Sequence, residues 1–137
     1  MIAYVDSSVL LRIVLGQPGH LREWPSIERG IASALIEVES LRTIDRLRVA
    51  GQLDVREAAE RSEAVFRVLE ELELIAMTPA VLRRAARPLA VPLGSLDAIH
   101  LASMELWREV HGELLVATHD TELAMAARAS GFRVAGA

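Results

Sequence analysis

The chain has 137 residues, 52% of them hydrophobic, with a formal charge of -4 and no cysteine. This length predicts a single domain over 1–137, and the lack of cysteine excludes disulfides, thiol catalysis and thiolate metal sites. All fifteen basic residues are Arg, which excludes P-loop phosphate binding and Schiff-base chemistry, because both need a Lys amine.

The predicted elements begin with a short apolar strand over 2–5 that ends at Asp6. A helix over 7–15 follows and is stopped by a glycine. The segment 17–30 reads as a connection with one short helical piece, and a second strand lies over 31–33. The opening therefore indicates a strand–helix–strand unit, which is typical of a parallel sheet.

The middle of the chain continues this alternation with two helices and a strand. The first helix covers 35–50, and the pair Asp54 and Glu57 forms a capping box that begins the second. Apolar residues at helical spacing continue to Leu72. A third strand is predicted over 74–77.

The last third of the chain repeats the pattern. Its predicted elements are a helix over 78–87, a loop over 88–94, a helix over 95–110 opened by Ser95, a strand over 114–117, a helix over 121–130 and an edge strand over 132–134. Short apolar strands separated by amphipathic helices predict a three-layer α/β/α fold with a central, mostly parallel sheet of four to five strands. Sites in such folds form beyond the carboxyl ends of the strands.

Three of the five Asp residues fall where such a site would form. Asp6 and Asp120 follow predicted strands, and Asp97 begins a helix. Taken singly, each is explained by helix capping or by the helix dipole. Clustered carboxylates, however, repel one another by about 4 kcal/mol per pair at about 4 Å, so a cluster calls for a cation. Oxygen ligands favour Mg²⁺ or Mn²⁺ over Zn²⁺.

The fourth acid of the cluster has two candidates on the helix after Ser33. On a helical wheel Glu37 lies in the apolar sector and Glu39 on the polar side, so periodicity alone favours Glu37 as the buried acid. The alternative for both is a solvated helix with Glu–Arg pairs at three- or four-residue spacing.

Four stretches distributed in order along nearly the whole chain carry a family resemblance. They are YVDSSVL over 4–10, SALIEVESLR over 33–42, LDAIHLA over 96–102 and ATHD over 117–120. Together they resemble PIN-domain ribonucleases, and specifically the VapC toxins of bacterial toxin–antitoxin pairs. The four linked motifs are far more specific than any one of them.

The resemblance implies a metal-dependent endoribonuclease toxin that hydrolyses RNA phosphodiester bonds with a metal-activated water. It implies that the family's acid after the second strand is Glu39, and not Glu37, which the helical wheel favours. The implied catalytic and metal-binding residues are Asp6, Glu39, Asp97 and Asp120, with Mg²⁺ or Mn²⁺ as cofactor and with Ser8 and Thr118 as the small hydroxyls beside the first and last acids. His119 stands where the family has an aromatic residue such as Tyr.

The resemblance also implies the partners. These are an RNA substrate, a small VapB-like antitoxin whose C-terminal segment lies in an apolar groove, and a second copy in a homodimer. The excess of aliphatic residues is compatible with such contacts. Because the chain is acidic, RNA phosphates must be met locally, and the nearest candidates are Arg12, Arg42 and Arg46. We expect a cytoplasmic protein without membrane contact, because no apolar run approaches about 18 residues.

The sequence also admits other interpretations. His100 lies one helical turn after Asp97 among apolar residues, and we interpret it as a packed helix residue outside the site. A receiver-like signalling domain also clusters acids at strand ends but typically places a Lys nearby, which this chain lacks. A PIN fold that only binds or assembles, without catalysis, is the remaining alternative.

Overall fold

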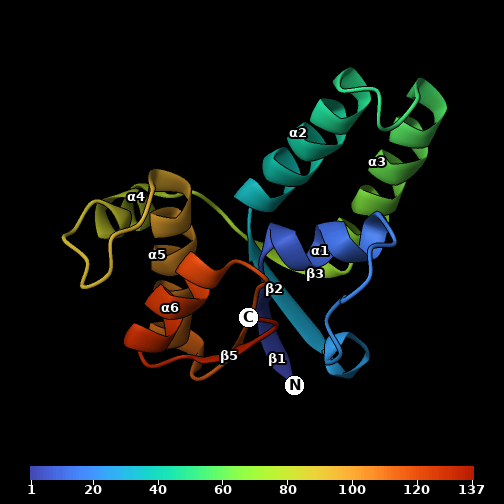
Figure 1. The fold of residues 1–137 in the computed structure, drawn as a ribbon. Helices are drawn as coiled ribbons and strands as arrows, with labels where there is room; N and C mark the ends of the chain where they lie inside the picture. The colour runs from blue at the N-terminus through green and yellow to red at the C-terminus, as the bar shows by residue number, and fades with distance from the viewer.

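The computed structural model describes residues 1–137 as one five-stranded, fully parallel sheet covered by helices on both faces (Figure 1). The spatial order of the strands is β3-β2-β1-β4-β5. The strands are β1 (Ile2–Val5), β2 (Arg29–Ser33), β3 (Leu72–Ile75), β4 (Leu115–Ala117) and β5 (Arg133–Ala135). The helices are α1 (Ser7–Val14), α2 (Leu35–Val49), α3 (Val55–Glu70), α4 (Pro79–Ala85), α5 (Ser95–His111) and α6 (Thr121–Ala129), with a short 3₁₀ helix at Trp24–Ser26.

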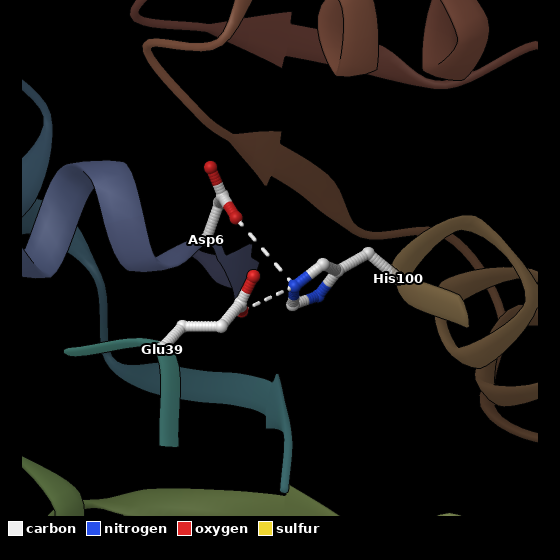
Figure 2. Close-up of side chains that lie close together, drawn as sticks. All are labelled: Asp6, Glu39 and His100. Atoms are coloured by element: carbon white, nitrogen blue, oxygen red, sulfur yellow. Dashed lines mark hydrogen bonds and ion pairs between the residues drawn. The ribbon is translucent and has the colours of Figure 1, made fainter. Parts of the chain in front are cut away.

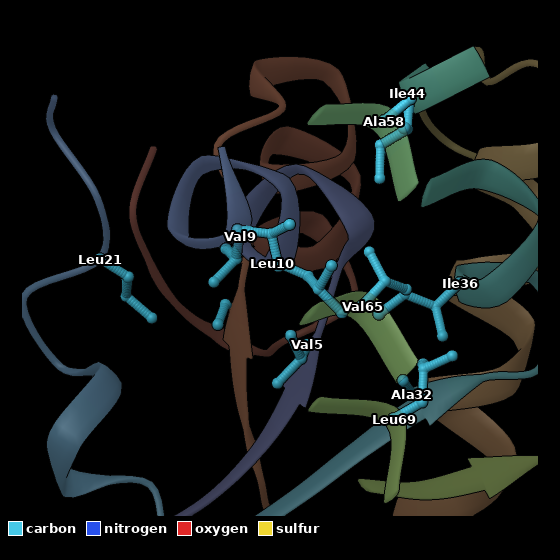
Figure 3. Close-up of a cluster of buried hydrophobic side chains, with 12 residues drawn as sticks. Val5, Val9, Leu10, Leu21, Ala32, Ile36, Ile44, Ala58, Val65 and Leu69 are labelled. Carbon is cyan, nitrogen blue, oxygen red and sulfur yellow. The ribbon is translucent and has the colours of Figure 1, made fainter. Parts of the chain in front are cut away.

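Two hydrophobic cores cover the two faces of the sheet. Val5 of β1 points into a core with side chains of α1, α2 and α3 (Figure 3). The neighbouring Tyr4 points the opposite way, into a core formed with α5 and α6. The three-layer α/β/α prediction is therefore confirmed.

The strand order reverses at β1. From β1 the chain builds outward through β2 to β3 on one side, and later returns to add β4 and β5 on the other. Because the strands are parallel, their carboxyl ends share one edge, and the loops after β1 and β4 leave this edge in different directions. Such a switch point is where doubly wound folds form their sites, and the residues that follow these two strands are Asp6 and the segment 118–120.

Several predicted boundaries were wrong. The second strand begins at Arg29, two residues earlier than expected, because Arg29 and Gly30 pair with Ile2 and Ala3 of β1. The third strand lies over Leu72–Ile75, two residues earlier than expected, because these residues pair with Gly30–Ser33 of β2. Leu72 continued the apolar spacing of the preceding helix and was therefore assigned to it. Gly94, not Ser95, is the N-cap of α5, and no side chain caps that helix.

The other helix signals behave as expected. The capping box of Asp54 and Glu57 is present at the start of α3, and Thr78 caps α4 ahead of Pro79. No helix of the structure is long and apolar enough to cross a membrane.

Candidate active site

Asp6 lies directly after β1 and is almost completely buried, with 5% of its surface exposed. It occupies the N-cap position of α1, but its side chain does not cap that helix. Instead Oδ2 accepts hydrogen bonds from the hydroxyls of Ser8 at 2.6 Å and Thr118 at 2.9 Å. The carboxylate is therefore held from one side, and Oδ1 has no hydrogen-bond donor within the protein.

The same two hydroxyls connect Asp6 to the segment after β4. The Ser8 hydroxyl oxygen accepts from the backbone N–H of His119 at 2.9 Å, and the Thr118 hydroxyl oxygen accepts from that of Asp120 at 3.0 Å. Ser8 and Thr118 thus lie where the sequence placed them, beside the first and last acids. They fix the positions of the two chain segments relative to each other.

Asp120 is held by the start of α6. Its Oδ1 accepts from the backbone N–H groups of Glu122 at 2.8 Å and Leu123 at 3.1 Å, which confirms its interpretation as an N-cap. Its Oδ2 makes no hydrogen bond within the protein. Capping the helix and contributing to a site are therefore compatible for this residue.

Glu39 reaches the site from the second turn of α2. Its Oε1 lies 2.6 Å from Nε2 of His100 on α5, so side chains from two distant helices meet at the edge of the sheet (Figure 2). Glu37 is exposed, and the helical-wheel interpretation that favoured it was wrong. The buried face of α2 contains Ile36, Ser40 and Ile44. Because Ser40 at its centre is polar, the hydropathy pattern did not identify this face as the buried one.

Asp97 lies half-buried in the first turn of α5. Its pKa is raised to about 6, chiefly because burial disfavours the charged form and further because of the negative charges of Asp120, Asp6 and Glu39. The charge of His100 lowers it. All three other acids therefore act on Asp97, and the four behave as one electrostatic cluster.

His100 is fully buried at the centre of this arrangement. Its Nδ1 lies 2.6 Å from the Tyr4 hydroxyl. Its Nε2 is 3.9 Å from Oδ1 of Asp6 and 2.6 Å from Oε1 of Glu39 (Figure 2). Burial lowers its pKa, but the hydrogen bond to Glu39 and the charges of the surrounding acids, Glu39 foremost, raise it more strongly.

The expectation that the ring nitrogens of His100 find partners is confirmed. The expectation that the residue lies outside the site was wrong. Its spacing of three residues from Asp97 was the signal that could have placed it there, because residues one turn apart share a helix face.

The donor set fits a divalent cation. Asp6, Glu39 and Asp120 each use one carboxylate oxygen for hydrogen bonds within the protein and leave the other without a partner, and Asp97 accepts none. No Arg forms an ion pair with any of the four acids. Apart from His100, no basic side chain compensates the charges of the four acids, and a cation held by their free oxygens would relieve the remaining repulsion. One ligand atom from each of Asp6, Glu39 and His100 lies within 4.8 Å of the others.

The three arginines expected near the site differ in their partners. Arg12 donates to the backbone oxygen of Gly19 at 3.0 Å and lines a groove of about 390 Å³ that also borders Asp120. Arg46 donates to the Thr43 hydroxyl. Arg42 is paired with an acid of its own helix at 3.1 Å. Arg12 and Arg46 thus have no carboxylate partner, whereas Arg42 has one.

Comparisons with known proteins agree with this geometry. The PIN domain model matches residues 3–129. Ribonuclease VapC47 of Mycobacterium tuberculosis (strain CDC 1551 / Oshkosh) is 29% identical over 137 residues, which cover 94% of this chain and 92% of that protein.

Two solved structures show a similar fold. FitAB bound to the IR36 DNA fragment has a TM-score of 0.72 at 16% identity, over 98% of this chain and 93% of that chain. VapBC2 from Rickettsia felis, bound to a DNA fragment from their promoter, has a TM-score of 0.66 at 10% identity, over 98% and 97%. The resemblance seen in the four sequence motifs is confirmed, a receiver-like domain is excluded, and the chain belongs to the PIN domain family.

Proposed function

We propose that this protein is a metal-dependent endoribonuclease and the toxin of a toxin–antitoxin pair. The observation that carries the proposal is the acidic group at the switch point of the sheet, where ligand atoms of Asp6, Glu39 and His100 lie within 4.8 Å of one another. Asp97 is close enough for the charges of Asp6, Glu39 and Asp120 to raise its pKa. Membership of the PIN family and similarity to a protein named Ribonuclease VapC47 support the reaction class.

Asp6, Glu39, Asp97 and Asp120 would hold Mg²⁺ or Mn²⁺. The metal would supply an activated water and would offset the charge that develops on the phosphate. The contribution of the chain is to keep its ligands oriented before the metal arrives. Ser8 and Thr118 fix Asp6, and the first amides of α6 fix Asp120.

The RNA backbone would lie along the groove beside Asp120. Arg12 lines this groove and has no carboxylate partner, so its guanidinium is available to a phosphate. Arg46 is available in the same way, whereas Arg42 would first have to leave its ion pair with Asp45. These local contacts would counter the net charge of -4.

We further propose a VapB-like antitoxin partner and a homodimer. A solved structure of similar fold is a toxin–antitoxin complex from Klebsiella pneumoniae, with a TM-score of 0.60 at 17% identity over 87% of each chain. This chain offers apolar surface for such contacts, including a cavity of about 620 Å³ lined mostly by hydrophobic side chains of α1, α3 and the segment around Trp24. Light scattering at micromolar concentration tests the dimer, and a monomer there would count against it.

The decisive experiment for the proposed reaction is RNA cleavage with Mn²⁺ compared with the same mixture containing a chelator. Cleavage by the wild type is expected only with the metal, and Glu39→Gln is expected to abolish it. Glu37→Gln is the matched control, because Glu37 lies on the same helix, is exposed, and takes no part in the cluster. If no class of RNA is cleaved, the catalytically silent PIN module becomes the better account.

A further inference from the structure

His100 has a buried hydrogen-bonding arrangement that the proposed reaction does not itself require. The ring lies between Tyr4 of β1 and Glu39 of α2, with both contacts at 2.6 Å and none of its surface exposed. Tyr4 of β1 contacts Nδ1 of the ring, and Asp6, directly after β1, lies 3.9 Å from Nε2, so an acid of the cluster and the hydroxyl that contacts the histidine are two residues apart in the chain. The arrangement therefore belongs to the site (Figure 2).

The position of one hydrogen follows from these contacts. An ionised carboxylate only accepts hydrogen bonds, so the 2.6 Å contact between Glu39 Oε1 and Nε2 requires a hydrogen on Nε2. In a neutral ring Nδ1 then accepts from the Tyr4 hydroxyl, and in a charged ring Nδ1 donates to it. In either state Nε2 carries a hydrogen that points at Glu39.

A histidine nitrogen that carries a hydrogen does not bind a metal. The distance of 2.6 Å between Nε2 and Oε1 is that of a short hydrogen bond. Nε2 is also 3.9 Å from Oδ1 of Asp6, too far for a hydrogen bond. His100 thus contacts Glu39 specifically, although it lies among several acids.

We propose that His100 is a positioning residue whose Nε2–H holds Oε1 of Glu39 and leaves Oε2 for the cation, while Tyr4 holds the ring in place. The inference rests on the proposed function, since it assigns a role at the metal site of that reaction. Hydrogen bonds from outside the ligand set orient metal-binding carboxylates in this way, and losing one typically weakens metal affinity by about 10- to 100-fold.

Two substitutions at His100 separate positioning from simple filling of the core. His100→Gln places an amide N–H close to where Nε2 lies, whereas the shorter His100→Asn places it near Nδ1. Mn²⁺ affinity measured by calorimetry is expected to stay near that of the wild type in the Gln variant and to fall by about 10- to 100-fold in the Asn variant. Equal affinities in the two variants would overturn the inference, because a residue that only fills space does not distinguish them.

A second measurement needs no substitution and stays informative if a buried change unfolds the protein. In the wild type with ¹⁵N-labelled histidine, NMR is expected to show Nε2 of His100 protonated both before and after saturation with Mg²⁺. Loss of that hydrogen on adding Mg²⁺ would mean that His100 binds the metal directly. This result would overturn the inference about His100 but leave the proposed function in place. Failure of the wild type to bind Mn²⁺ at all would overturn the proposed function together with it.

Discussion

Replacing Asp97 by Asn is expected to make the metal-free protein more stable at neutral pH. The pKa of Asp97 is raised from 3.8 to about 6, so the folded state binds its proton more tightly than the unfolded state does. For such a group the free energy of unfolding falls as the pH rises from about 4 to about 6, and above about pH 6 the full destabilisation is present. Asn has no charge to bury, so the variant escapes the cost.

The size of the effect follows from the shift in pKa. A shift of about two units corresponds to at most about 3 kcal/mol. Asp97 is half-buried, so solvent screening reduces this free energy to about 1.5 kcal/mol. The substitution also removes a carboxylate that interacts favourably with the N-terminus of α5, which lowers the gain by about 0.5 kcal/mol. We expect a net gain of about 1 kcal/mol, or a Tm about 3 to 5 °C higher at pH 7.5.

Thermal unfolding in the presence of a chelator measures this gain. The difference between Asp97→Asn and the wild type should be largest at pH 7.5 and vanish below about pH 3, where the wild-type carboxyl is protonated in both the folded and the unfolded state. Glu37→Gln is the matched control, since Glu37 also lies in the first turn of its helix but outside the cluster. It should give no gain. An Asp97→Asn variant less stable than the wild type at pH 7.5 would refute the electrostatic reasoning.

Three other outcomes are expected. Mn²⁺ affinity should fall as the pH drops through about 6, because Asp97 of the metal-free protein must release its proton to bind a cation, and an affinity unchanged from pH 7.5 to 5 would speak against its role. Thr118→Val removes a buried hydroxyl that donates to Asp6, so urea unfolding should show a loss of about 1 to 3 kcal/mol together with weaker Mn²⁺ binding, whereas unaltered binding would disprove the orienting role. Gly30→Ala places a Cβ 2.5 Å from Cδ2 of Leu72, the end of a flexible and partly exposed side chain that can turn away, so urea unfolding should show a loss of at most about 1 kcal/mol, and a loss above about 3 kcal/mol would contradict this reasoning.

The architecture could be predicted because each strand is a short apolar run bounded by helix signals. The order of these elements along the chain was enough to indicate a parallel sheet and to place Asp6 and Asp120 at its carboxyl edge. Strand boundaries were harder to place. Leu72 continues the helical spacing of apolar residues in α3, but it is the first residue of β3. Its strand conformation results from backbone pairing with Gly30, which the local sequence does not reveal.

The site shows what periodicity alone misses. Ser40 is fully buried at the centre of the inner face of α2. Because serine is polar, a helical wheel based on hydropathy placed the buried face too close to Glu37. The linked motifs corrected this error because they compare positions and not polarity. His100 was placed with the core for a related reason, since its partners Tyr4 and Glu39 are 96 and 61 residues away in sequence.

The central claim is that Asp6, Glu39, Asp97 and Asp120 share a divalent cation. The most direct measurement is anomalous diffraction from crystals of the wild type grown with Mn²⁺. The account predicts a manganese peak bounded by oxygens of these four carboxylates, with Nε2 of His100 turned to Glu39 and outside ligand distance. Crystals saturated with Mn²⁺ that show no peak among these carboxylates, or a peak elsewhere on the molecule, would contradict it.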